Sequence, residues 1–303
     1  MIKSITATNY LGESIKMELA RPEKSGFIVY NISGLGPGKA NINTTEVSTD
    51  DGGLFNSARL PSRNIVIGLM FMWKDSIEEA RHRSYKYFPL KKKVKLLIET
   101  DTRTAEIEGY VDANEPNIFS KSEGSSISII CPNPYFYSVE DDHSEIVFSG
   151  IESAFEFPFS NESLTENMIE LSITQNVAEQ VVTYNGDAEI GVTITINVLA
   201  PATHITIYNT GTREVMRINT DRLEAFTGSG LQSGDELTIC TVKKRKSITL
   251  LRNGKTTNIL NCLDRNPDWF SLAKGDNVFA FTAESGSNNL QFKIAHQVIY
   301  EGV

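Results

Sequence analysis

Two glycine-containing segments have the residue types of nucleotide-binding or catalytic loops. The first, Gly34–Gly38, has the sequence GLGPG and lacks the spacing of a dinucleotide-binding loop and the G-K-[ST] end of a P-loop. The second, Thr227–Gly230, has the sequence TGSG and lacks the strand–turn–helix context of the G-x-S-x-G nucleophile elbow. We therefore interpret both segments as turns, the first of them followed by an extended stretch at Lys39–Thr45.

Histidine and cysteine side chains are the usual ligands of transition metals, and here they are isolated along the chain. The four histidines are His82, His143, His204 and His296, and the three cysteines are Cys131, Cys240 and Cys262. No histidine has a second His or Cys two to four residues away, and the cysteine separations of 109 and 22 residues match no zinc spacing. The sequence therefore predicts no metal and no cofactor, three buried free thiols, and packed or interfacial histidines.

Carboxylates and aromatic rings leave two further kinds of chemistry open. A glycosidase needs two carboxylates at a fixed separation, and the 38 acidic residues offer no means of choosing a pair. Exposed aromatic rings stack on sugars, but rings in strands usually belong to the core. We retain Trp269 as the candidate glycan-stacking aromatic. These residues leave open two functions, a carbohydrate-binding β-sandwich adhesin that recognises a cell wall and a wall-degrading hydrolase.

A run of positive charge lies between Lys74 and Ile98, where eight basic residues face three acidic ones. The candidate assembly or channel-facing basic patch consists of Arg81, Arg83, Lys86, Lys91, Lys92, Lys93 and Lys95. One interpretation is a solvated helix end and an edge strand whose lysines block further strand pairing. The other is a surface that meets an acidic neighbour or a transiting polyanion.

The net charge of the 303-residue chain is −9, and this acidity belongs to its second half. Residues 1–140 hold 17 basic and 17 acidic side chains, which leaves 12 basic and 21 acidic ones for residues 141–303. This balance argues against a general nucleic-acid binder. The longest apolar run has nine residues, 65–73, against about 20 for a spanning helix, so no membrane insertion is expected. The N-terminus has no apolar signal region, which predicts synthesis in a cytoplasm.

The elements that would position these residues are mainly strands. Alternating apolar and polar residues predict strands at 27–32, 94–99, 126–130, 191–197, 204–208 and 290–294. Asn253–Gly254 has the residues of a type I′ turn and predicts a hairpin over 247–257. One helix is predicted at 75–88, with Ser76 and Glu79 as a capping box and Tyr85 near its buried face. A shorter helical turn is predicted at 267–272.

The length suits two domains of about 100–200 residues each, and two prolines indicate where the first domain ends. Pro132 and Pro134 stop a strand ladder because they lack an N–H, and the polar stretch 140–144 follows them. The sequence therefore predicts a domain at 1–138 and a second domain at 139–303.

Several segments follow one another in a characteristic order along both halves of the chain. In the first half they are the strand at 27–32, the turn at 34–38, RLPSRNIVIGL at 59–69, the helix, the strand at 94–99 and CPNPYFYS at 131–138. In the second half they are YNGDAEIG at 184–191, YNTGTRE at 208–214, LQSGDELTI at 231–239, the strand at 244–251 and WFSLAKGDN at 269–277. By these segments and their order, nearly the whole chain resembles the siphophage distal tail protein family, also called the Dit family.

The resemblance implies a mainly β protein with an N-terminal β-sandwich-like ring or belt domain carrying one α-helix. It implies a C-terminal galectin-like β-sandwich that projects outward. Proteins of this family are structural, with no catalytic residues to transfer, so no enzyme is expected. The implied function is a homo-hexameric ring at the virion tail tip, assembled in the bacterial host cytoplasm, that joins the tail tube protein to the tail-tip hub and receptor-binding proteins. The implied ring lets viral DNA pass without specific binding.

Overall fold

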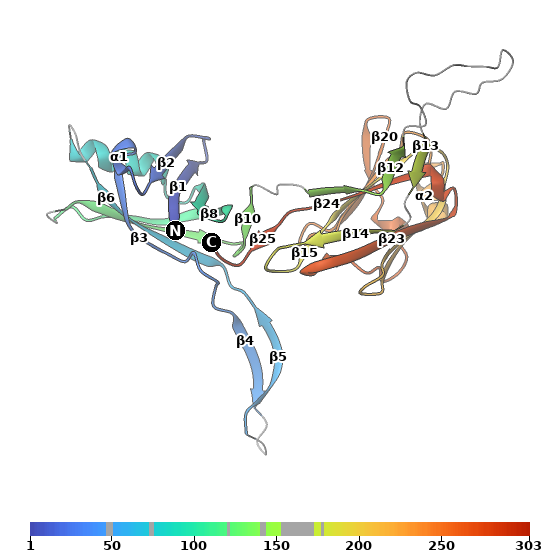
Figure 1. Ribbon diagram of the computed structural model, residues 1–303, viewed down its shortest axis with the longest axis horizontal. Helices are drawn as coiled ribbons and strands as arrows, with labels where there is room; N and C mark the ends of the chain where they lie inside the picture. The colour runs from blue at the N-terminus through green and yellow to red at the C-terminus, as the bar shows by residue number, and fades with distance from the viewer. Residues whose placement is uncertain (47–50, 73–75, 120–121, 140–143, 153–172, 177–178) are drawn as a thin grey trace, which may run out of the picture. The chain divides into compact units, whose positions relative to one another are not determined.

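The computed structural model describes residues 1–46, 51–72, 76–119, 122–139, 144–152, 173–176 and 179–303. The chain is mainly β, as the sequence predicts, and its strands pair antiparallel. It forms two compact units (Figure 1). Unit 1 consists of Met1–Asp141 together with Ile299–Val303, and unit 2 consists of Asp142–Val298.

Unit 1 is built on one antiparallel sheet with the strand order β2-β1-β7-β8-β9-β6-β3. Its strands are β1 (Ile2–Asn9), β2 (Ser14–Glu18), β3 (Phe27–Ser33), β4 (Asn41–Glu46), β5 (Gly53–Arg59), β6 (Arg63–Phe71), β7 (Lys93–Thr100), β8 (Thr104–Pro116), β9 (Gly124–Cys131), β10 (Phe136–Ser138) and β25 (Ile299–Tyr300). Met17 of β2 and Phe27 of β3 come from opposite ends of this order, and both belong to one core cluster. The sheet therefore bends round a single core.

Helix α1 (Ile77–Tyr87) confirms the predicted helix, which ends before Pro89. Ser76 is its N-cap, but the Ser76 side chain makes no capping hydrogen bond, so the predicted capping box is wrong. The helix buries Ala80 and Ser84 against unit 1, whereas Tyr85 is exposed and does not lie on the buried face. Position 85 faces solvent because position 84 occupies the inner face. Residue 75, included in the predicted helix, lies outside the described residues.

The strands β4 and β5 form a separate two-stranded sheet within unit 1. Figure 1 shows them as a long hairpin that extends away from the rest of the unit. Every residue of both strands is exposed. This hairpin therefore adds nothing to the core of unit 1.

The C-terminal segment Ile299–Val303 is held in unit 1 by strand pairing and by one buried arginine. Strand β25 pairs with β10, where Tyr300 lies opposite Phe136. The guanidinium of Arg63 donates to the Glu301 carbonyl oxygen at 2.6 Å. The segment Ile299–Val303 is thus bound to unit 1 through β10 and Arg63.

Unit 2 contains two main sheets with the orders β11-β24-β16-β19-β20-β21 and β14-β23-β17-β18. Its strands are β11 (Ser144–Val147), β12 (Ser149–Glu152), β13 (Ile173–Asn176), β14 (Glu179–Tyr184), β15 (Ile190–Gly191), β16 (Thr193–Val198), β17 (Thr203–Asn209), β18 (Glu214–Ile218), β19 (Glu236–Cys240), β20 (Ser247–Arg252), β21 (Lys255–Asn258), β22 (Ser271–Leu272), β23 (Gly275–Ser285) and β24 (Leu290–His296). Short 3-10 turns lie at Pro22–Lys24 in unit 1 and at Leu260–Cys262 and Ser287–Asn289 in unit 2.

Aromatic rings join the two sheets of unit 2 into a β-sandwich. The rings of Phe281 on β23 and Phe292 on β24 stack with centroids 3.7 Å apart. Phe148 packs against both of them at 5.9 and 6.4 Å. Because β23 and β24 belong to different sheets, these contacts bring the two inner faces together over one core.

The local predictions for unit 2 were confirmed for a hairpin, wrong for a helical turn, and missed one helix. The predicted hairpin is confirmed as β20 and β21, with Asn253 and Gly254 at φ 50° and 76°. The predicted helical turn at 267–272 is wrong, because residues 271 and 272 pair as β22 with β15. Helix α2 (Thr220–Thr227) was not predicted. Its signals are Asn219, whose side chain accepts the Arg222 N–H, and Gly228 at φ 80°.

Candidate functional site

Both glycine-containing segments are turns held by arginines, and neither opens a helix. The guanidinium of Arg63 donates to the carbonyl oxygens of Gly34 and Gly36 at 2.7 and 2.5 Å. The guanidinium of Arg252 donates to Ser229 Oγ at 2.6 Å and to the Gly230 carbonyl oxygen at 2.7 Å. These contacts give the two turns a structural role.

Four members of the predicted basic patch form ion pairs with carboxylates of unit 1. The pairs are Arg81–Glu123 at 2.6 Å, Lys86–Glu13 at 2.8 Å, Lys93–Glu108 at 2.7 Å and Lys95–Glu106 at 2.5 Å. The hydrogen bond with Glu123 raises the pKa of Arg81, and the hydrogen bonds with their carboxylates likewise raise the pKa of Lys86 and of Lys93. All four carboxylates lie outside the segment 74–98, so its local charge excess is largely neutralised.

Arg83 is used within the fold of unit 1. Its Nη2 donates to the Ser25 carbonyl oxygen at 2.9 Å, and its guanidinium lies over the Phe27 ring at 5.5 Å. Lys74, which belongs to the predicted positive run, lies outside the described residues.

Unlike Arg81, Lys86, Lys93 and Lys95, the lysines Lys91 and Lys92 have no carboxylate partner among the described residues. They occupy the turn between α1 and β7, where the Lys91 N–H donates to the Val111 carbonyl oxygen at 2.8 Å. The Lys92 ammonium lies 5.3 Å from the centre of the Tyr10 ring. Tyr10, Leu11 and Leu90 beside them are 52%, 65% and 54% exposed. We call the set Tyr10, Leu11, Leu90, Lys91 and Lys92 the Lys91 patch.

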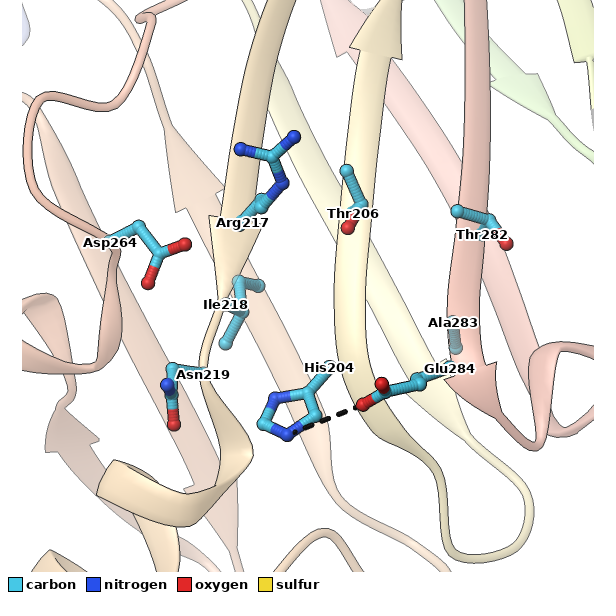
Figure 2. A pocket seen from close by; sticks show the side chains of 9 residues that line it. All are labelled: His204, Thr206, Arg217, Ile218, Asn219, Asp264, Thr282, Ala283 and Glu284. Atoms are coloured by element: carbon cyan, nitrogen blue, oxygen red, sulfur yellow. Dashed lines mark ion pairs between the residues drawn. The ribbon is translucent and has the colours of Figure 1, made fainter.

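Unit 2 carries a pocket of about 430 Å³ over β17, β18 and β23 (Figure 2). It is lined by His204, Thr206, Arg217, Ile218, Asn219, Asp264, Thr282, Ala283 and Glu284. His204 Nε2 lies 3.5 Å from Glu284 Oε2, the contact dashed in Figure 2, and 3.5 Å from Asp221 Oδ2. The lining offers hydrogen-bond donors and acceptors and both signs of charge. Sequence reasoning missed it because its residues come from three strands and two loops far apart in the chain.

Trp269, the predicted glycan-stacking residue, does not line this pocket. Its side chain is half-buried, and the Lys246 ammonium lies 5.0 Å from the ring centroid. The structure therefore does not bring Trp269 together with the polar groups of unit 2 that face the pocket. A role for Trp269 in stacking on sugars stays a prediction.

The cysteines are free thiols, of which Cys131 and Cys262 are buried and Cys240 is half-buried. Burial raises the pKa of Cys131 to about 11 and also raises the pKa of Cys262. His296 is buried and packs edge-on against Tyr184, with centroids 5.6 Å apart. His143 lies outside the described residues.

In the described part of the chain, no group of three or more His, Cys, Asp or Glu side chains has the arrangement of a metal site. No helix in the same residues has the length and apolar character needed to cross a bilayer.

The chain is thus a protein of two β units, and unit 1 carries an exposed hairpin and the Lys91 patch. Residues 185–298 match the family described as siphovirus-type tail component, C-terminal domain. This match confirms the resemblance to the Dit proteins over residues 185–298. It supports a component of the phage tail. No curated protein sequence matches the chain significantly.

One solved structure has the same fold as this chain. The structure of SPP1 Dit (gp 19.1), described as a paradigm of the hub adsorption apparatus in phages that infect Gram-positive bacteria, matches 97% of this chain and 98% of its own. The TM-score is 0.62 at 13% sequence identity, so the two chains share a fold. A chain of the phage P2 baseplate in its activated conformation with Ca is also similar, with a TM-score of 0.45, 13% identity and 98% of both chains covered.

Proposed function

We propose that the protein is a structural component of the virion that forms a hexameric ring at the distal end of a phage tail. The ring joins the tail tube to the tail-tip and host-adhesion apparatus. The observation that carries this proposal is the match of residues 185–298 to the C-terminal domain of siphovirus-type tail components. The fold shared with SPP1 Dit over nearly the whole chain supports the same function.

Within this proposal unit 1, which contains the predicted domain at 1–138, forms the ring, and unit 2 projects from it as a galectin-like sandwich. The partners are five further copies of the chain, the tail tube protein, the tail-tip hub and receptor-binding proteins. The ring works without catalysis or cofactor. A closed ring needs two different surfaces on each copy that fit one another by rotation. The net charge of −9 over residues 141–303 would keep the six projecting domains apart.

The test of the ring is the mass of the full-length protein in solution, alone and mixed with the tail tube protein of the same phage. A hexamer weighs six times 33.6 kDa, about 200 kDa. We expect particles of this mass in sedimentation, with six-fold views in negative-stain images. A protein that stays monomeric in both samples would contradict the ring. If that monomer also bound cell-wall glycans, the adhesin would be favoured instead.

Reversing the charge of Lys91 and Lys92 is expected to weaken assembly and to reduce its dependence on salt. The two ammonium groups have no carboxylate of their own among the described residues, so they are available to an acidic partner surface. Salt screens such contacts over about 8 Å at physiological ionic strength. The measurement is the fraction of Lys91→Glu/Lys92→Glu protein in the ring at several salt concentrations.

The matched control is Lys243→Glu/Lys255→Glu, which makes the same change in net charge at exposed positions of unit 2. This control is expected to assemble like the unmodified protein. If the Lys91/Lys92 variant also assembled normally at every salt concentration, these lysines would have no part in the ring. Lys93 and Lys95 are expected to matter less, because Glu108 and Glu106 already pair with them.

A further inference from the structure

The β4–β5 hairpin is a sheet without a partner. It pairs with no other strand among the described residues, and all its side chains are exposed. A two-stranded hairpin by itself is only marginally stable in water, and three or more strands or a packed face are needed for independent stability. A surface that packs on this hairpin would therefore stabilise it as well as bind it.

The strand register gives the hairpin one apolar face and one mainly polar face. Residues directly opposite one another share a face, and so do alternate residues of a strand. Ile42 lies opposite Ala58 and Thr44 opposite Phe55, and the register shifts by one residue between these pairs, so the four side chains share one face. The other face carries Asn43, Thr45, Leu54 and Ser57. Ile42 and Phe55 are 65% and 66% exposed, so the apolar face is open to a partner.

The end of the hairpin that lies away from the core is acidic. Glu46 lies opposite Gly53 at the last pair of the ladder, and Asp51 lies on the connection between the strands. Neither carboxylate pairs with a basic side chain in the described part of the chain. The hairpin thus combines an apolar face with negative charge beyond it.

The Lys91 patch has the complementary character. It combines three exposed apolar side chains with two ammonium groups that no described carboxylate neutralises. Figure 1 shows the hairpin extending away from the rest of unit 1. Because Ile42 and Phe55 stay exposed in the single copy, its hairpin does not pack on its own patch, and the partner that fits is a second copy.

We propose that the apolar face of the β4–β5 hairpin docks on the Lys91 patch of the next copy of the chain, with Glu46 and Asp51 near Lys91 and Lys92. The contact joins two different surfaces, which is the heterologous kind that closes into a ring. The inference rests on the proposed ring and names the surfaces that hold it together.

The first test compares two double variants of the full-length protein. Ile42→Asp/Phe55→Asp places two charges on the apolar face, and the control Asn43→Asp/Ser57→Asp places them on the other face of the same hairpin. We expect the first to raise the protein concentration of half-assembly by about 100-fold or more, as loss of central apolar contacts does in interfaces. The control is expected to stay near the unmodified value. Circular dichroism checks that both remain folded. Equal assembly of the two variants would overturn the proposal.

A charge exchange tests the pairing itself. Lys91→Glu/Lys92→Glu and Glu46→Lys/Asp51→Lys are each expected to assemble poorly, and the protein with all four changes is expected to recover. Failure of the fourfold variant to recover would count against direct contact. A cysteine pair gives an independent measure, since Phe55→Cys and Leu90→Cys proteins should form a disulfide-linked dimer when mixed. Absence of that dimer within an assembled ring would exclude the contact.

The outcomes separate this contact from the ring. If the unmodified protein forms particles of about 200 kDa and the hairpin variants do too, the contact is wrong and the ring stands. If the unmodified protein forms no ring alone or with the tail tube protein, the ring and the contact fail together.

The native cysteines need a control in the crosslinking experiment. Cys131 and Cys262 are buried, and each single cysteine variant by itself serves as the control for disulfide links through Cys240.

Discussion

Replacement of Arg63 by alanine is expected to destabilise unit 1 by about 3–5 kcal/mol, because several hydrogen bonds from one buried charged group are lost together. The side chain is 6% exposed, and its guanidinium lies 4.8 Å from the centre of the Phe136 ring. It donates to four carbonyl oxygens, those of Gly34 at 2.7 Å, Gly36 at 2.5 Å, Pro134 at 2.7 Å and Glu301 at 2.6 Å. Alanine leaves these oxygens without their donor.

The cost is large because a hydrogen bond to a charged group contributes about 1.5–3 kcal/mol, and an unsatisfied buried group adds its desolvation penalty. Burial lowers the pKa of Arg63, but an arginine stays charged at neutral pH. Four contacts of one group are not additive, so the total stays below their sum. Glu301 is one of the four acceptors, so the C-terminal segment is also expected to detach and become open to proteases.

Urea unfolding followed by circular dichroism measures this effect. Arg59→Ala is the control, since Arg59 is an exposed arginine at the end of β5, and surface changes of this kind usually stay within about 0.5 kcal/mol. Arg63→Lys is expected to fall between the two, because an ammonium keeps the charge but cannot reach four acceptors. A loss below about 1 kcal/mol for Arg63→Ala would show that water replaces the lost donors.

Arg63 also shows where sequence reasoning ends. Alternation predicted the strands of both units, and Asn253–Gly254 predicted a hairpin, because these signals are local. The acceptors of Arg63 are not local, since Glu301 lies 238 residues further along the chain. The missed helix α2 has a local signal in Asn219 and Gly228, but it is only eight residues long and lies among strands.

The basic segment shows the same limit at the candidate site. Counting charges along 74–98 gave an excess of five, yet Glu13, Glu106, Glu108 and Glu123 reach it from elsewhere in unit 1. Only three-dimensional proximity separates Lys91 and Lys92 from the paired residues. The β4–β5 hairpin shows the same limit. The sequence predicts an extended stretch at 39–45, but it does not tell whether the Ile42 side chain packs in a core or faces solvent.

The second large effect is expected in unit 2, where Asp235→Ala should destabilise the sandwich by about 3–5 kcal/mol. Asp235 is 3% exposed, and its carboxylate accepts from Arg252 Nε at 2.8 Å and Nη2 at 2.5 Å. It also accepts the Gln232 N–H at 2.8 Å. The bidentate pair raises the pKa of Arg252 through its hydrogen bonds to Asp235. Alanine at position 235 leaves this guanidinium charged, largely buried and without its counter-ion.

A double-mutant cycle separates the pair from the loss of each side chain. Arg252→Ala is expected to cost less than the sum of its separate hydrogen bonds, and the double variant Asp235→Ala/Arg252→Ala less than the two single losses added together. The reason is that the double variant leaves no unpaired charge in the sandwich. Glu189→Ala, at an exposed acidic position of the same unit, is the control and should change stability by less than about 0.5 kcal/mol. Additive losses in the cycle would mean that the two groups act independently. In that case Arg252 would stabilise unit 2 mainly through Ser229 and Gly230, by holding the turn that follows α2.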